Sequence, residues 1–185
     1  MPENTTKKKS LLRGCLSYVL YVFIVIAAVY LVITYVGQRT EVSGDSMLNT
    51  LHNGDNLIVD KLSYRFREPE RFEVIIFPSQ FEEHTFYIKR IIGLPGETVQ
   101  IKEGYIYINC ERLYESYGNE VMLEETYGIA AEPITLGEDE YFVLGDNRNK
   151  SLDSRSEQVG IVHKNEFIGK AWLRIWPFED FGLVE

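Results

Sequence analysis

Residues 15–36 form an unbroken apolar run, CLSYVLYVFIVIAAVYLVITYV, and no charged residue occurs between Arg13 and Arg39. A helix of this length, rising about 1.5 Å per residue, spans roughly 33 Å and matches a hydrocarbon core of about 30 Å. A cleavable signal peptide, which is the alternative, has an apolar region of only about 7–15 residues that ends in small residues. Here the two alanines lie in the middle of the run. The sequence therefore predicts a retained transmembrane helix over residues 14–37.

The charges that flank this run predict its orientation. Residues 1–13 carry four Lys or Arg against one Glu, a net charge of +3, whereas only Arg39 follows the run closely. The positive-inside rule then predicts a cytoplasmic tail over 1–13 and an extracytoplasmic domain over 38–185 of a cell-membrane protein with a single span. Beyond the tail, the chain carries 15 basic against 27 acidic residues, a net charge of −12. This acidity argues against nucleic-acid binding.

The pattern of residues 38–185 is typical of β-strands. Short segments rich in Val, Ile, Tyr and Phe alternate with turn signals, and no window of twelve or more residues has a convincing helical period. The expected strands lie within 56–62, 71–77, 85–92, 98–101, 104–108, 140–144, 159–163 and 167–176. We predict a mainly β fold, a barrel-like all-β domain in which the acidic stretch from about 111 to 140 is an insertion or flap.

The segment SGDSM, residues 43–47, places a serine just beyond the apolar run. Gly-Asp-Ser is ordinary turn chemistry, which is the simpler interpretation. The segment is not a hydrolase nucleophile elbow, because Leu48 stands where Gly-x-Ser-x-Gly needs its second glycine. Ser46 follows Gly37 by nine residues, so even an extended chain keeps it within about 30 Å of the predicted membrane surface.

The segment FYIKRIIGLPGE, residues 86–97, carries one cation on each face of an otherwise apolar strand. At least one cation is therefore expected among apolar side chains. Arginine keeps its proton in proteins, whereas a desolvated lysine can lose it, so Lys89 is a candidate general base. The alternative is a lysine that extends to solvent.

The segment LGDNRNKSLDSR, residues 144–155, follows a predicted strand and gathers polar side chains in one loop. A polar surface turn is the simpler interpretation. The close spacing of its carboxylates and arginines, however, predicts a rigid loop bonded within itself.

In this order, the apolar run, Ser-Met, Tyr-x-Lys-Arg-Ile-x-Gly-x-Pro-Gly and Gly-Asp-Asn-Arg-x-x-Ser-x-Asp-Ser-Arg resemble the type I signal peptidases, and the short insertion resembles their compact Gram-positive members. The resemblance covers nearly the whole chain and implies a membrane-anchored serine endopeptidase that removes N-terminal signal peptides. Its substrates would be secretory precursors with small residues at −1 and −3, and its other partners the lipid bilayer and, as a further candidate, the translocation channel.

The resemblance also implies roles for individual residues. Ser46 would be the nucleophile, with its backbone N–H in the oxyanion hole, and Lys89 the general base. Ser151 would hold the lysine amine by a hydrogen bond. Four charged residues would brace the site: Asp146, Arg148, Asp153 and Arg155. Five residues would line apolar pockets for the substrate: Val42, Met47, Leu51, Tyr87 and Ile88.

Two residues depart from the family's pattern. Asn49 stands where the family usually has proline, which frees a backbone torsion and adds an N–H. Gly44 stands where some relatives have a serine that donates to the oxyanion, so that donor is missing here. Cys110 follows Asn109 between two predicted strands, where a turn residue is the expected interpretation and a reactive thiol the alternative.

Other interpretations remain open at this point. A Ser–His–Asp triad would use one of His52, His84 and His163, of which His52 is nearest to Ser46 in sequence. A non-catalytic, membrane-anchored binding module would keep the fold without the chemistry. No Cys/His cluster has the spacing of metal ligands, and no cofactor is expected.

Overall fold

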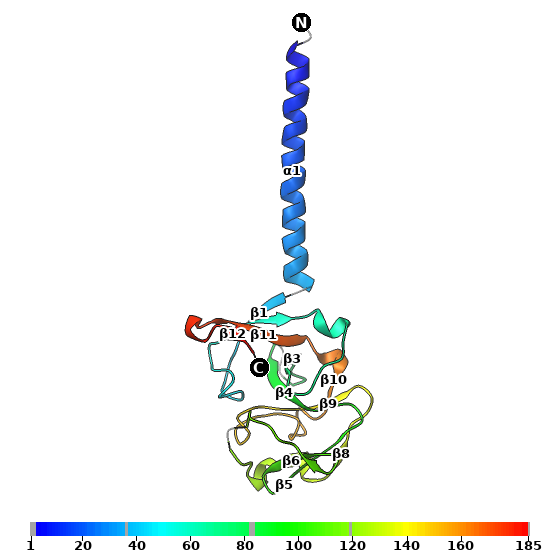
Figure 1. Ribbon diagram of the computed structural model, residues 1–185, viewed down its shortest axis with the longest axis vertical. Coiled ribbons are helices and arrows are strands. Elements are labelled where there is room, and N and C mark those ends of the chain that lie inside the picture. The colour runs from blue at the N-terminus through cyan, green and yellow to red at the C-terminus, as the bar shows by residue number, and fades with distance from the viewer. Residues whose placement is uncertain (1–2, 36, 82–83, 119, 185) are drawn as a thin grey trace. The chain divides into compact units, whose positions relative to one another are not determined.

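The computed structural model describes residues 3–35, 37–81, 84–118 and 120–184, without the side chains of residues 3–13 and 31–35 (Figure 1). The chain divides into two compact units, Met1–Gly37 and Gln38–Glu185. The first unit is one helix, α1 (Glu3–Tyr35). Within the described residues, no helix combines the length and the apolarity that crossing a membrane requires. The predicted tail, 1–13, and the end of the predicted span, 31–36, lie outside the residues whose side chains are described.

The second unit is mainly β, as predicted. Its strands are β1 (Gly37–Glu41), β2 (Asn56–Asp60), β3 (Val74–Pro78), β4 (Phe86–Gly93), β5 (Thr98–Lys102), β6 (Tyr105–Ile108), β7 (Glu111–Arg112), β8 (Ile134–Thr135), β9 (Glu140–Leu144), β10 (Val162–His163), β11 (Gly169–Trp176) and β12 (Gly182–Leu183). The helices described in this unit are short 3-10 turns: η1 (Ser63–Arg65), η2 (Glu124–Thr126), η3 (Gly128–Ala131), η4 (Lys164–Glu166) and η5 (Phe178–Asp180). The expected scarcity of helix is therefore confirmed for the described part of 38–185.

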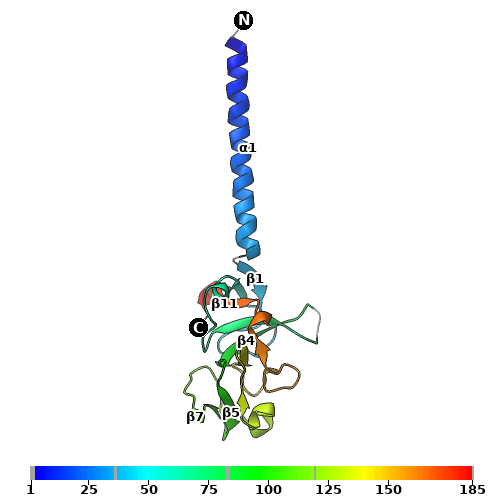
Figure 2. The same cartoon turned by 90° about the vertical axis from the view of Figure 1, so that its right-hand side faces the viewer.

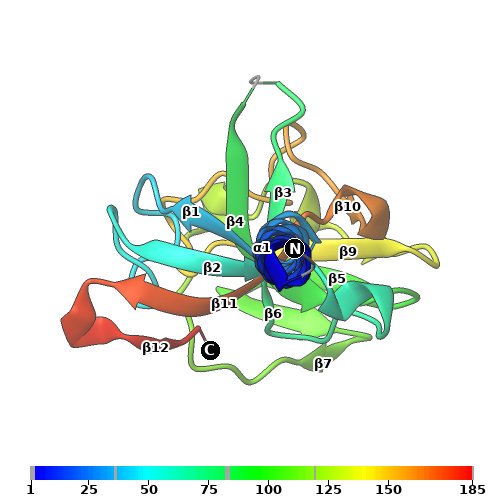
Figure 3. The same cartoon turned by 90° about the horizontal axis from the view of Figure 1, so that it is seen from above.

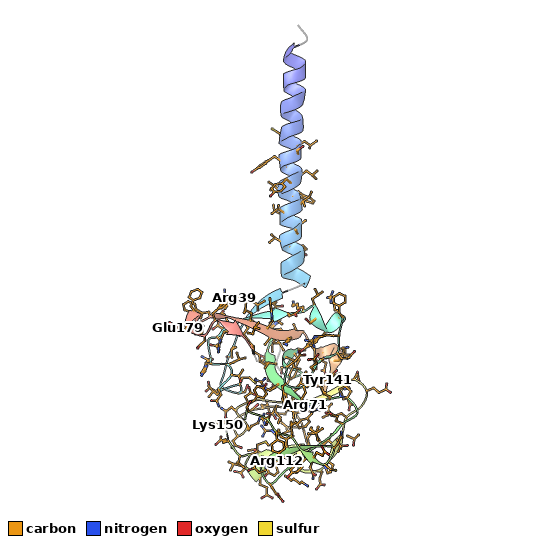
Figure 4. The ribbon with its side chains drawn as sticks, in the orientation of Figure 1. Arg39, Arg71, Arg112, Tyr141, Lys150 and Glu179 are labelled. Atoms are coloured by element: carbon orange, nitrogen blue, oxygen red, sulfur yellow. The ribbon has the colours of Figure 1, made fainter. Side chains whose placement is uncertain are left out.

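The strands form two antiparallel sheets. The larger runs in the order β1-β2-β11-β3-β4-β9-β10, with β12 added beside β11 (Figure 3). The smaller runs β7-β6-β5-β8, and its strands β7 and β5 are labelled in Figure 2. At the edge of the larger sheet, Arg39 donates from Nε and Nη2 to Asn56 Oδ1 at 2.9 and 2.7 Å, which ties β1 to β2 (Figure 4).

In the described residues neither sheet closes on itself, whereas the sequence predicted a barrel-like all-β domain. The physical reason lies at the end of β4. The pairing of β4 with β9 shifts register between Ile91 and Gly93, and the chain then turns away from the larger sheet. Strand β5 finds its partners locally, in the hairpin strand β6 and in β8, so these strands build a second sheet.

Strand alternation divides the buried apolar residues among three clusters. One cluster lies under the segment that carries Ser46 and includes Met47, Leu51 and Leu57. A second lies on the larger sheet and includes Ile91 and Val143. The third joins the smaller sheet to the larger one; it consists of Ile92, Val99, Ile101, Ile106, Ile108, Met122, Tyr127, Ala130, Leu136, Phe142 and Leu144. Strand β4 contributes to both sheets' cores, which fixes its position between them.

The acidic stretch from 111 to 140 packs on the smaller sheet. Met122, Tyr127, Ala130 and Leu136 from this stretch are all buried in the third cluster. Tyr127 also accepts a hydrogen bond on its hydroxyl from the backbone N–H of Gly104 at 2.5 Å. These apolar anchors are interspersed with exposed acidic residues, so the stretch has no regular period in the sequence.

Candidate active site

Ser46 lies in a tight turn that is packed on the core through its apolar side chains. The turn is closed by backbone hydrogen bonds from Leu48 N to Asp45 O at 3.2 Å and from Leu51 N to Met47 O at 2.8 Å. Met47 and Leu51 are buried and hold the turn by its apolar side chains. Asn147 fixes the turn from above, with its backbone N–H on Ser46 O and its Nδ2 on Asp45 O, both at 3.0 Å.

Both residues that depart from the family's pattern have left-handed backbones. Gly44 has φ +91° and donates its N–H to Asn53 Oδ1 at 2.9 Å. Asn49 has φ +84°, a conformation that asparagine tolerates and that proline, with φ fixed near about −65°, does not. The turn therefore takes a conformation here that depends on a non-proline residue at position 49.

Lys89 of β4 lies directly against the serine. Its Nζ is 2.7 Å from Ser46 Oγ and donates a hydrogen bond to it. The side chain is only 3% exposed, and this burial lowers the pKa of Lys89 to about 8, against the opposing influence of the Asp153 and Asp146 carboxylates. The cause is desolvation, which disfavours the charged amine. A neutral amine is therefore accessible near neutral pH at hydrogen-bonding distance from a hydroxyl.

Asp146 is held by Arg90, a residue of β4 to which the sequence analysis gave no role. The Arg90 guanidinium donates from Nε to Asp146 Oδ1 at 2.9 Å and from Nη2 to Oδ2 at 2.7 Å, and both side chains are fully buried. Thr50 donates its hydroxyl to Asp146 Oδ2 at 2.5 Å. The pair thus ties the loop after β9 both to β4 and to the end of the serine's turn. Both cations of β4 are buried, where the sequence predicted at least one.

Asp153 and Arg155 form the pair within the loop that the sequence predicted. Arg155 donates from Nε to Oδ1 and from Nη2 to Oδ2, both at 2.8 Å. Asp153 Oδ2 also accepts the backbone N–H of Gly145 at 3.0 Å, which closes the loop on itself. Arg148, in contrast, pairs outside the loop with Glu115, so only part of the loop is bonded within itself.

Ser151 is half-buried beside the serine's backbone. A Cβ on Gly145 would overlap both Ser151 Oγ and the carbonyl oxygen of Ser46, so the three residues meet at a point where only glycine fits. Among the described residues, Ser151 Oγ is buried and has no hydrogen-bond partner. The amine of Lys89 is bonded to Ser46, and the expected bond to Ser151 is not formed in this arrangement.

A cavity of about 480 Å³ opens over Ser46 and Lys89. Val42, Met47, Tyr87 and Ile88, four of the five residues expected to contact substrate, line it. Leu51, the fifth, is fully buried in the core beneath and does not line the cavity. Two other lining residues had been considered in other roles, Gly44 at the oxyanion position and His84 in a triad. Sequence reasoning missed the remaining lining residues, Thr40, Glu41, Ser43, Asp45, Thr85, Phe86, Lys150 and Leu152, of which Lys150 is labelled in Figure 4.

Of the three histidines, which all belong to the described residues, only His84 lines the cavity over Ser46. His52 is exposed, and its backbone N–H donates to Asp55 Oδ2 at 3.0 Å. His163 Nδ1 lies 3.4 Å from Asp139, and His84 lines the rim of the cavity. The described residues contain no group of three or more His, Cys, Asp or Glu that could hold a metal ion. Cys110 and Asn109 both have positive φ, at +69° and +51°, as a tight hairpin turn requires.

Comparison with known proteins shows the family to which the chain belongs. Residues 15–176 match the model of the family described as "Signal peptidase, peptidase S26". The "Probable signal peptidase I-2" of Synechocystis is 39% identical over 156 residues, which cover 82% of this chain and 68% of that protein. The "Signal peptidase I" of Bacillus licheniformis is 34% identical over 183 residues, covering 96% of this chain and 95% of that protein. A crystal structure of a signal peptidase I from Enterococcus faecalis V583 is 38% identical and covers 56% of this chain and 97% of its own, with a TM-score of 0.46.

These matches define the class of the protein as a serine peptidase, a hydrolase, so the expected enzyme is confirmed. The chain belongs to the signal peptidase family, peptidase S26. The resemblance inferred from the motifs is thereby confirmed over most of the chain.

Proposed function

We propose that this chain removes N-terminal signal peptides by a serine–lysine mechanism, with Ser46 as nucleophile and Lys89 as general base. The observation that carries the proposal is the 2.7 Å contact between Lys89 Nζ and Ser46 Oγ, made by an amine whose pKa burial lowers to about 8. A serine hydroxyl is a weak nucleophile that needs an adjacent base, and a neutral lysine can serve without histidine.

The proposed steps balance as an acyl transfer. The Ser46 hydroxyl transfers its proton to neutral Lys89 as Oγ attacks the scissile carbonyl carbon, and the backbone N–H of Ser46 donates to the developing oxyanion. The ammonium of Lys89 then protonates the leaving amine of the mature protein, which leaves the signal peptide as an ester on Ser46. A water molecule, deprotonated by Lys89, hydrolyses the ester and restores the hydroxyl.

The supporting residues would position Ser46 and Lys89 and would take no part in making or breaking the peptide and ester bonds. Ser151, whose hydroxyl is buried next to Gly145, would accept or donate a hydrogen bond to the amine once Ser46 is acylated. Asp146, Arg148, Asp153 and Arg155 would keep the loop rigid through their buried ion pairs. Rigid support matters because a misplacement of about 1 Å can cost about 100-fold in rate.

Substrate choice would follow from the shape of the cavity. Val42, Met47, Tyr87 and Ile88 give its floor and walls an apolar character that suits small residues at −1 and −3 of a precursor. Leu51 would act from behind, by supporting Met47 in the core. Secretory precursors are therefore the proposed substrates.

We further propose that residues 14–37 anchor the chain in the cell membrane, with the tail 1–13 in the cytoplasm and residues 38–185 outside. The support is the uncharged run between Arg13 and Arg39 together with the net charge of +3 before it. The lipid bilayer, and as a further candidate the translocation channel, would then be partners. A reporter fused after Glu185 should be active only outside the cytoplasm, and protease added to spheroplasts should digest the β domain. Protection of the domain with loss of the tail would reverse the orientation.

The catalytic proposal is tested by cleavage of an Ala-x-Ala precursor with the full chain in detergent micelles. Ser46→Ala should abolish cleavage with the fold intact by circular dichroism, because it removes the only proposed nucleophile. Thr135→Ala is the control, since it removes an exposed hydroxyl of the smaller sheet that does not line the cavity, and it should keep substantial activity. Persistent cleavage by Ser46→Ala would refute the assignment of the nucleophile.

A further inference from the structure

Arg148, the only arginine between the strand β9 and Ser151, is held from outside its own loop. Its guanidinium is 2% exposed and donates from Nη1 and Nη2 to the carboxylate of Glu115, the second bond at 2.7 Å. Gly118 covers the same guanidinium closely: a Cβ there would stand 3.3–3.4 Å from its atoms. The remaining donor, Nε, bonds the carbonyl oxygen of Gly145 at 3.0 Å.

The same short segment, residues 115–118, which we call the strap, also covers the second buried arginine. The Tyr117 ring lies over the Arg90 guanidinium, with 3.6 Å between Cζ and the ring centroid. Tyr117 packs in turn on Phe72, with 5.3 Å between the ring centroids. Phe72 O accepts a hydrogen bond from Arg90 Nη1 at 2.7 Å, so ring, carbonyl and guanidinium form one packed unit.

Both arginines lead to the backbone around the reacting serine. Arg148 holds Gly145, which is wedged against Ser46 O and Ser151 Oγ. Arg90 holds Asp146, which binds the hydroxyl of Thr50 at the end of the serine's turn. The strap therefore contacts both arginines, and through them it supports the turn that carries Ser46 on two sides, at Gly145 and at Thr50.

We propose that Glu115 and Tyr117 are positioning residues for Ser46, which act through Arg148 and Arg90 and do not touch substrate. The strap contributes no residue to the cavity over Ser46 and Lys89, so its contacts should affect the alignment of the hydroxyl and not the binding of precursor. This inference rests on the proposed mechanism at Ser46 and Lys89.

Charge and stacking explain why these two side chains suit the task. Arg148 is a buried cation, and the Glu115 carboxylate supplies both its counter-charge and two hydrogen bonds in a fixed plane. Arg90 has its charge paired by Asp146, and the Tyr117 ring adds a cation–π contact on one face of the guanidinium. Loss of either contact frees a guanidinium to tilt, and the tilt displaces Gly145 or Asp146.

The test compares Glu115→Gln and Tyr117→Leu with two matched variants in the full chain, by kcat and KM for an Ala-x-Ala precursor. Glu115→Gln should lower kcat about 10- to 100-fold with KM within about threefold, since small displacements of reacting groups cost this much. Tyr117→Leu should behave likewise. Tyr117→Phe keeps the ring and should stay within about threefold of wild type. Glu111→Gln, on an exposed carboxylate of β7, should leave both constants unchanged.

Thermal unfolding of each variant separates positioning from simple loss of fold. A positioning role predicts that the kcat deficit persists at temperatures well below the variant's own Tm, where the chain is fully folded. The proposal is overturned if folded Glu115→Gln and Tyr117→Leu have wild-type kcat, or if they raise KM and leave kcat unchanged. Ser46→Ala, assayed beside them, distinguishes the two claims: cleavage by Ser46→Ala overturns the mechanism itself, whereas an inactive Ser46→Ala with fully active strap variants overturns the strap alone.

Discussion

Replacing Asp146 by asparagine should be among the most destabilising single changes in the β domain. The substitution keeps the shape of the side chain and removes its charge, so Arg90, which is 0% exposed, would lose the carboxylate that balances its charge in the core. Breaking a buried ion pair in this way costs about 3–5 kcal/mol. A domain of this size has a free energy of unfolding of about 5–15 kcal/mol, so a large share of its stability would be lost. At about 2–4 °C per kcal/mol, Tm should fall by roughly 10 °C.

The assay is thermal and guanidinium unfolding of the full chain in detergent micelles, followed by tryptophan fluorescence and near-UV circular dichroism. Glu68→Gln is the control, because Glu68 pairs with Lys164 through a carboxylate that is 75% exposed. An exposed pair is worth less than about 1 kcal/mol, so this variant should unfold like wild type. Equal stability of Asp146→Asn and Glu68→Gln would refute the reasoning, because it would mean that the Arg90 charge is solvated or paired elsewhere.

Two further predictions concern a second buried carboxylate and the serine's turn. Burial alone would raise the pKa of Glu73, but hydrogen bonds from Arg67 and Lys170 lower it to about 2 from an ordinary value of 4.5. Because the folded pKa is the lower one, this stabilisation is complete above pH 4.5 and is lost as the pH falls towards 2, an effect on the order of 3 kcal/mol. The free energy of unfolding of Glu73→Gln, measured with urea, should be lower than that of wild type at pH 7 and should depend less on pH between 4.5 and 2. An unchanged dependence on pH would contradict the assignment. At the turn, Asn49→Pro should lower Tm and precursor cleavage, since proline cannot adopt φ +84°, whereas Asn49→Gly should retain both. Equal activity of the two variants would show that the left-handed turn is not required.

Much of the fold follows from local sequence patterns. All eight segments expected as strands overlap one, and 140–144 coincides with β9. The same patterns predicted that at least one cation of β4 is buried, because both faces of this strand are apolar, and the structure buries both Lys89 and Arg90. The short strands β7 and β8, of two residues each, were missed, because two residues are too few to show an alternation. The division into two sheets was missed for a related reason: it depends on a register shift after Ile91, which leaves no mark in composition.

The partners that complete the site were beyond sequence reasoning. Arg90 was noticed only as a second cation, and its pairing with Asp146 spans 56 residues. Glu115 belongs to an acidic stretch in which nothing distinguishes it from its neighbours, and it reaches Arg148 across 33 residues. Side-chain pairs at such separations are set by tertiary packing, and a single sequence carries no signal that selects one acidic residue over another.

The most direct test of the serine–lysine mechanism is kcat/KM for precursor cleavage as a function of pH, measured for wild type, Lys89→Arg and His52→Ala. Lys89 must be neutral to accept the Ser46 proton, and burial lowers its pKa to about 8, so wild-type activity should rise with pH through a midpoint near 8. If Lys89 had the unperturbed pKa of about 10.4, activity would instead rise at a pH about two units higher. Lys89→Arg should be inactive at every pH, because a guanidinium keeps its proton, and His52→Ala should follow the wild-type curve. Normal cleavage by Lys89→Arg, or a folded but inactive His52→Ala, would contradict the mechanism.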